Sequence, residues 1–164
     1  MKPWIVLSSF LAAGALMLGL AMVPQHVGAA EEVLVAQASA TGASKRRLAL
    51  MREMSKTRKA LTASAKAGKI GPGDVARGER IAAITQELGG LWPEGSGSDK
   101  IKTRAKPEIW KDMGKFRQNL EGIQKAAADG AAAAKAGDAA GVGKAMGAMN
   151  CGGCHKPFRG PKPK

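Results

Sequence analysis

The sequence predicts an all-α protein, an antiparallel four-helix bundle, and three observations carry that prediction. The 164 residues include 22 Gly and many Ala, but only three Phe, three Trp and no Tyr. Small residues suit closely packed helices, whereas a β-sandwich needs β-branched and aromatic residues. Four segments space their apolar residues in steps of three and four, and no segment alternates as a strand would. The length fits one domain.

Residues 1–30 have the layout of a secretory signal. Lys2 precedes an uncharged apolar run at residues 5–23, and small residues suited to signal peptidase follow at 27–30, with a second candidate site at 36–38. An uncleaved anchor is the alternative, because the run approaches the about 20 residues that span a bilayer. We therefore expect a periplasmic protein. Removal of residues 1–30 takes away Lys2 and no acid, which lowers the formal net charge from +13 to +12.

Residues 31–43 are predicted to be a disordered lead-in, and residues 44–160 to form the helical domain. The first helix is expected from Ser44, as N-cap, to about Ala67. The second is expected to begin at Asp74 and to end at the glycine pair 89–90. Its expected inner face follows helical spacing and consists of Val75, Gly78, Ile81, Thr85 and Leu88.

A loop at residues 91–106 separates these two helices from the next two. Pro107 suits the first position of a third helix, which is expected to reach about Ala136. Gly137 and Asp138 then mark a turn, and a last helix is expected to continue into a cysteine pair. Residues 161–164 are predicted to be a loose tail. The third helix carries the clearest apolar stripe, made of Ile109, Met113, Phe116, Leu120, Ile123 and Ala127.

The only two cysteines belong to the motif Cys151-Gly152-Gly153-Cys154-His155. This spacing is the attachment signature of c-type haem, in which two thiols add to the haem vinyl groups and the histidine donates a nitrogen to the iron. The sequence therefore predicts one covalently attached haem c near the C-terminus, with Cys151 and Cys154 as attachment residues and His155 as a ligand of the metal.

Other uses of the motif fit less well. A thioredoxin-like pair needs an alternating α/β chain, and a zinc site needs four ligands where three are near. An exported bundle without haem, carrying thiols or a metal, remains as a third hypothesis. No Ser/His/Asp set or paired carboxylates indicate catalysis, so we do not expect an enzyme.

The sequence does not determine which residue, if any, is the second axial ligand of the iron. His26 lies in the signal, so His155 is the only histidine of the mature chain, and Tyr is absent. A methionine is then the expected internal ligand, unless the iron is five-coordinate. The candidates are Met51, Met54, Met113, Met146 and Met149.

The strong positive charge raises the question of nucleic acid. Lys and Arg are spread along the whole chain without interleaved aromatic residues. We expect no nucleic-acid binding, and instead a basic surface for an acidic redox partner.

The chain resembles the cytochrome c′ family, the class II c-type cytochromes, over about residues 45–160. Their haem motif lies near the C-terminus of a four-helix bundle. Four pieces carry the resemblance: Arg47, Met51 and Met54; residues 91–96, Leu-Trp-Pro-Glu-Gly-Ser; residues 103–110 with Phe116; and the haem motif with Phe158 and Arg159.

The resemblance implies roles for further residues. Met51 matches the position that faces the iron opposite His155, and Arg47 matches a residue near the haem propionates. Thr103 or Arg104 is implied at the haem edge, and Arg159 on the proximal side. The family includes members in which a methionine binds the iron and five-coordinate members that admit NO or CO. The resemblance thus implies either an electron carrier or a gas-binding protein, and a possible homodimer.

Overall fold

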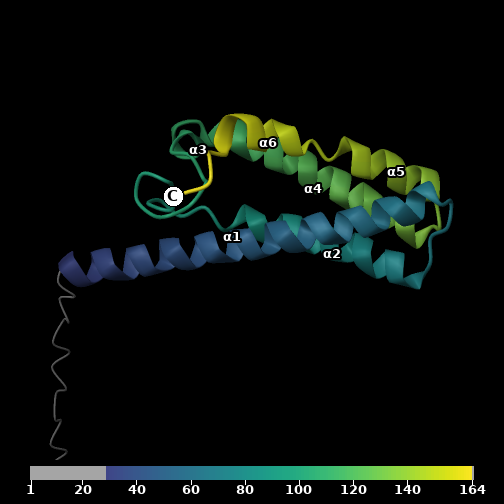
Figure 1. The fold of residues 1–164 in the computed structure, drawn as a ribbon, viewed down its shortest axis with the longest axis horizontal. Coiled ribbons are helices and arrows are strands. Elements are labelled where there is room, and N and C mark those ends of the chain that lie inside the picture. Colours follow the sequence, from purple (N-terminus) through teal and green to yellow (C-terminus); the bar gives the residue numbers. More distant parts are fainter. Residues whose placement is uncertain (1–28, 164) are drawn as a thin grey trace, which may run out of the picture.

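The computed structural model describes residues 29–163, and it confirms the predicted four-helix bundle. Its helices are α1 (Ala29–Lys66), α2 (Pro72–Gly89), α3 (Glu108–Lys111), α4 (Met113–Lys135), α5 (Ala139–Ala148) and α6 (Cys151–Phe158). Helices α1, α2, α4 and α5 pack around one another as the bundle, and α6 continues the direction of α5 (Figure 1). Within residues 29–163, no strand forms, and no helix is both long and apolar enough to cross a membrane.

Helix α1 begins earlier than the sequence indicated. Residues 31–43 belong to this helix, so the prediction of a disordered lead-in and of an N-cap at Ser44 is wrong. The segment contains no proline and one glycine, Gly42, and its Ala, Glu, Leu and Gln residues are good helix formers. A single glycine costs about 1 kcal/mol in a helix, which does not stop an otherwise favourable segment. The predicted signal at residues 1–30 lies almost wholly outside the described residues.

Two predicted helices are each divided in two. Asp112 separates α3 from α4, and its carboxylate accepts a hydrogen bond from the Lys115 N–H at 3.1 Å. Asn150 separates α5 from α6 in the same way and accepts from the Gly153 N–H at 3.0 Å. Short polar side chains satisfy the free N–H groups of a first helical turn, so they favour a new start over continuation.

The buried side chains form three clusters. The largest lies between α1, α2, α4 and α5 and holds Leu61, Ile81, Ile123 and Val142 among alanines. A second joins Leu50 of α1 to Ile84 and Leu88 of α2. The third, near α3 and α6, is made of Ile109, Phe116 and Phe158. The predicted stripes of α2 and of the third helix face these clusters, with Val75 and Met113 only half-buried.

Candidate haem site

The haem motif occupies the first five residues of α6, where Asn150 caps the helix. Cys151 and Cys154 are unpaired, half-buried thiols three residues apart, so they lie about one helical turn from each other. Both pack against the large aliphatic cluster, and Cys154 also contacts the aromatic cluster of Phe116 and Phe158. Two thiols on one helical face against apolar side chains suit a flat, apolar group joined through two thioether bonds.

Gly153 explains part of the spacing within the motif. A Cβ at this position would come within 2.9 Å of the Asn150 side chain and 3.1 Å of the Asn119 side chain. Asn119 of α4 also donates a hydrogen bond to the Gly153 carbonyl at 3.3 Å. The glycine therefore lets α6 lie close to α4 while Asn150 keeps its cap. Sequence reasoning missed both asparagines, although an Asn directly before Cys151 is itself a helix-start signal.

His155 follows the second cysteine and is exposed as a residue, yet its imidazole is partly desolvated. That desolvation lowers its pKa below the usual value near 6.5, and the positive charges of Arg159 and Arg104 act in the same direction. A neutral imidazole has a free nitrogen lone pair, which is the form that binds iron. Burial raises the pKa of the Cys154 thiol, with the nearby Cys151 adding to the effect.

The candidate methionines fall into different environments. Met146 and Met149 are buried in the large cluster, and a Cβ at Gly130 would collide with the Met146 methyl, so Met146 fills the core. Met113 packs in the aromatic cluster beside α6. Met51 and Met54 lie on α1, half-buried against Leu50 and its neighbours.

Arg47 is buried on α1, one turn before Met51, and is held by the loop at residues 91–106. Its guanidinium donates to the Leu91 carbonyl at 2.7 Å and to the hydroxyl and carbonyl oxygens of Ser96, both at 2.8 Å. Burial lowers the pKa of Arg47 to about 10, so it stays charged at neutral pH. Its contacts in the described chain are thus loop oxygens rather than a carboxylate side chain.

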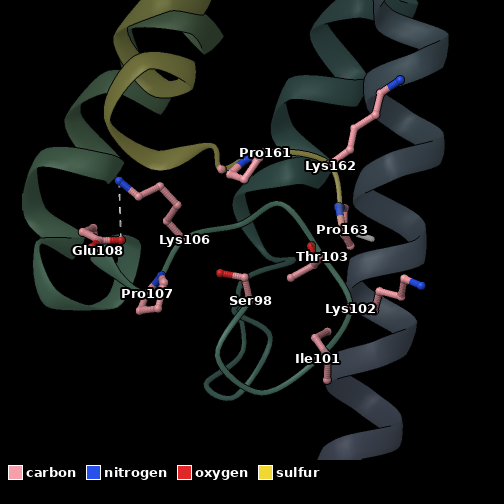
Figure 2. A pocket seen from close by; sticks show the side chains of 11 residues that line it. Ser98, Ile101, Lys102, Thr103, Lys106, Pro107, Glu108, Pro161, Lys162 and Pro163 are labelled. Atoms are coloured by element: carbon pink, nitrogen blue, oxygen red, sulfur yellow. Dashed lines mark ion pairs between the residues drawn. The ribbon is translucent and has the colours of Figure 1, made fainter.

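Thr103, Arg104 and Arg159 gather where the loop meets the end of α6. The Arg104 Nε donates to the Gly160 carbonyl at 2.7 Å, and Ala105 pairs with Arg159 in an isolated antiparallel bridge. Thr103 lines a cavity of about 410 Å³ between this loop and the C-terminal residues (Figure 2). The structure therefore brings these three residues to the His155 side, whereas Arg47 and Met51 lie across on α1.

The two helices that carry these sides, α1 and α6, are not in backbone contact. In the described chain, α6 packs on α3 and α4, and α1 packs on α2 and α5, with no backbone contact between α1 and α6. Figure 1 shows α6 and α1 on opposite sides of the same end of the molecule. Apolar walls, two thiols and an imidazole on one side, and thioethers on the other, fit a haem. The described residues hold no cluster of three His, Cys, Asp or Glu side chains that would suit a metal ion alone.

Comparison with known proteins agrees with this site. The family model described as Cytochrome C' matches residues 42–159. The chain is 41% identical over 83 residues to a cytochrome c′ of Pararhodospirillum photometricum, covering 49% of this chain and 66% of that protein. It is 40% identical over 81 residues to one of Rhodospirillum rubrum, covering 48% of this chain and 54% of that protein. These alignments span less than two thirds of both relatives.

Solved structures extend the match over the whole bundle. The crystal structure of cytochrome c′ from Thermochromatium tepidum has a TM-score of 0.64 and 26% identity, covering 74% of this chain and 97% of that one. A nitric oxide complex of a cytochrome c prime mutant from Alcaligenes xylosoxidans, 24% identical with a TM-score of 0.65, covers 74% and 97% and shares the fold. Family members carry covalently attached haem c, which the two cysteines of α6 fit. The chain belongs to the cytochrome c′ family.

Proposed function

We propose that this cytochrome is an exported carrier of single electrons whose haem iron is bound by His155 and Met51. The position of Met51 on α1 carries the proposal, together with the cytochrome c′ pattern, which matches Met51 rather than Met54 to the residue that faces the iron. Of the candidate methionines, Met146 and Met149 are enclosed in the core and Met113 lies beside α6. Met51 is half-buried on α1, where it packs against the Leu50 cluster.

A bound haem would supply reversible one-electron exchange, and His155 and Met51 would hold its iron. A thioether ligand favours the ferrous state and raises the reduction potential. The half-buried setting of Met51 keeps its sulfur near apolar neighbours, with Leu50 and Leu88 limiting the access of water. His155 is kept neutral by partial desolvation and by the nearby arginines, so it is available as a ligand at neutral pH.

A basic rim around the motif supports docking of an acidic redox partner. Residues 151–163 contain no acid, and the adjoining loop brings further lysines to the same end. Figure 2 shows Lys102 and Lys162 near α1, and Lys106 across the cavity, where it is paired with Glu108 at 3.8 Å. Like charges gathered on one face steer an oppositely charged protein toward it. The exposed members of the rim are Lys100, Lys102, Lys156, Arg159 and Lys162.

The test is an ultraviolet–visible spectrum of the haem protein, oxidised, reduced with dithionite, and reduced with CO. We expect sharp reduced bands that CO leaves unchanged, because Met51 closes the iron. Met51→Leu is expected to give a high-spin protein that binds CO at once, while the control Met113→Leu keeps the original spectrum. Unchanged spectra in the Met51 variant would exclude Met51 as a ligand, and Met54→Leu would then be measured.

The second candidate is a five-coordinate protein that binds NO or CO. One observation favours it: the apolar side chain of Met51 is half-buried beside Leu50, and apolar surroundings admit a diatomic gas more readily than a polar ligand. The Alcaligenes xylosoxidans protein is known as a nitric oxide complex. A broad reduced spectrum that CO sharpens in the unmodified protein would decide for this function.

The proposal also includes export to the periplasm and the oligomeric state. Periplasmic export rests on the signal layout of residues 1–30, and the N-terminal sequence of the mature protein tests it. One solved relative, 26% identical, is described as showing ligand-controlled dimer dissociation. A homodimer of this chain through α1 and α2 is tested by sedimentation of the reduced protein with and without CO.

A further inference from the structure

A row of stacked side chains joins α1 to α6 at the haem end of the bundle. The Arg47 guanidinium lies 4.5 Å above the centre of the Trp92 ring. Trp92 meets Phe116 edge-on with ring centres 4.5 Å apart, and Phe116 meets Phe158 edge-on at 5.3 Å. We call these four residues, Arg47, Trp92, Phe116 and Phe158, the strut.

The strut begins and ends beside the two proposed iron ligands. Arg47 precedes Met51 by one turn of α1, and Phe158 follows His155 by three residues in α6. Phe158 and Cys154 share the same cluster. The strut is therefore a continuous line of packed atoms from the helix that carries Met51 to the helix that carries His155.

Each member of the strut is held by contacts of its own, and Phe116 is 3% exposed with its N–H donating to the Asp112 carbonyl at 3.1 Å. Arg47 is only 5% exposed, and three hydrogen bonds hold it to the loop. The Trp92 indole donates to the Leu88 carbonyl at 2.6 Å, and its own carbonyl accepts from Trp110 at 3.3 Å. Phe158 is 5% exposed, and its carbonyl accepts from the Lys106 N–H at 3.0 Å. Close-packed aromatic rings transmit displacement because they have few rotamers and no free volume.

Helices α1 and α6 need such a connection because, within residues 29–163, their backbones do not touch. Near the end of α5 that leads to α6, Arg58 of α1 donates two hydrogen bonds to the Met146 carbonyl, at 2.6 and 3.2 Å. That contact holds α5, which the break at Asn150 separates from α6. The spacing between α1 and α6 therefore depends on side chains that reach across, and the strut does so beside the ligands.

We propose that the strut sets the distance between Met51 and His155 and thereby controls how tightly the distal side of the iron is closed. Its members act as positioning residues, because they touch the helices that carry the ligands. This inference rests on the proposed function in one respect, namely that the iron lies between α6 and the Met51 side of α1. It holds for Met51 as a ligand and for Met51 as a steric cover.

The test measures CO association with the reduced haem protein in strut variants and in a matched control. Phe158→Leu and Trp92→Leu shorten the strut, and Val142→Ala removes buried volume from α5, outside the strut and nine residues before Cys151, where Val142 is 0% exposed. All variants are compared by thermal melting, so that strut and control variants of similar loss in Tm are paired. We expect CO association at least tenfold faster in the strut variants and changed less than twofold in the control.

Substitutions of Arg47 distinguish an effect of helix spacing from an effect of charge. Arg47→Lys keeps the positive charge but loses the forked hydrogen bonds to Leu91 and Ser96, and Arg47→Met loses both. If the strut acts through the spacing between α1 and α6, both variants should accelerate CO binding and raise the high-spin fraction of the oxidised protein. An effect in Arg47→Met alone would assign the change to charge and overturn the role of the strut.

Two further results bear on the proposal. Hydrogen exchange of the haem protein should show faster exchange of residues 91–96 and 151–158 in Phe158→Leu, and this readout stands if Trp92→Leu does not fold. Equal CO rates in strut and control variants would disprove the strut. Failure of the Met51 assignment is seen separately, in the spectra of the unmodified protein and of Met51→Leu.

Discussion

Where α4 packs on α2 and on α5, the helices touch through glycine and alanine, whereas at the haem end aromatic rings and a buried guanidinium lie between the helices. Gly78 shows the first kind of packing, since a Cβ there would lie 3.0 Å from the Cα of Ala131. The row from Arg47 to Phe158 shows the second. Small residues let backbones approach, and large ones with fixed hydrogen bonds keep a separation that a flat cofactor needs.

The largest expected effect tests the close packing of α4 on α2. Gly78→Val should lower the free energy of unfolding by about 2–3 kcal/mol, because the backbone of α4 cannot move away from the added carbons. The haem spectrum should stay unchanged. Urea unfolding measures the loss, and Gly122→Ala, at an exposed helical glycine with open space around its Cα, is the control. The control should gain about 0.5–1 kcal/mol. Equal stabilities of the two variants would contradict the close approach.

A smaller loss of stability is expected from a substitution at Gly153 in the haem motif. Gly153→Ala should cost about 1 kcal/mol, because the new methyl group displaces the Asn150 cap. Gly152→Ala is the matched control, since the nearest atoms to its Cβ lie at 3.6 and 3.7 Å. Thermal melting of both haem proteins measures the difference. If the two alanine variants melt together, the cap contributes little to α6.

The smallest expected effect is the pH dependence of stability that Asp74 contributes at the start of α2. Burial alone would raise the pKa of Asp74, but hydrogen bonds from the Gly71 N–H, Ser64 and Arg77 outweigh it and lower the pKa below its usual 3.8. A carboxylate with a lowered folded pKa stabilises the protein above its unfolded pKa, and this is lost as pH falls through the folded value. Asp74→Asn should therefore lower Tm at pH 7, by a difference that shrinks as the pH falls through the folded pKa of Asp74. A constant difference across this range would refute the role of the charge.

The bundle and the haem attachment could be predicted because each depends on residues close together in the sequence. Steps of three and four placed Ile109, Phe116, Leu120 and Ile123 on one buried face, as the structure has them. The motif needs only residue order. Helix interruptions were missed, since Asp112 and Asn150 act as caps within segments whose apolar spacing continues across them.

Contacts between segments far apart in the chain could not be predicted from the sequence. The hydrogen bonds of Arg47 to Leu91 and Ser96 join residues more than forty positions apart, and nothing local to either segment indicates them. The same holds for the pairing of Ala105 with Arg159. The resemblance to cytochrome c′ named Arg47, Thr103, Arg104 and Arg159, and their roles toward the haem stay predictions.

The break at Asn150 has a consequence for motion. Helix α6 is eight residues long, is joined to α5 through Met149 and Asn150, and among the described helices packs on α3 and α4, so we expect it to open as a small cooperative unit. Such units open at a lower free energy than global unfolding. Opening of α6 would expose Cys151 and Cys154 while α1, α2, α4 and α5 stay folded. Before haem is attached, such opening would make both thiols accessible without unfolding of the bundle.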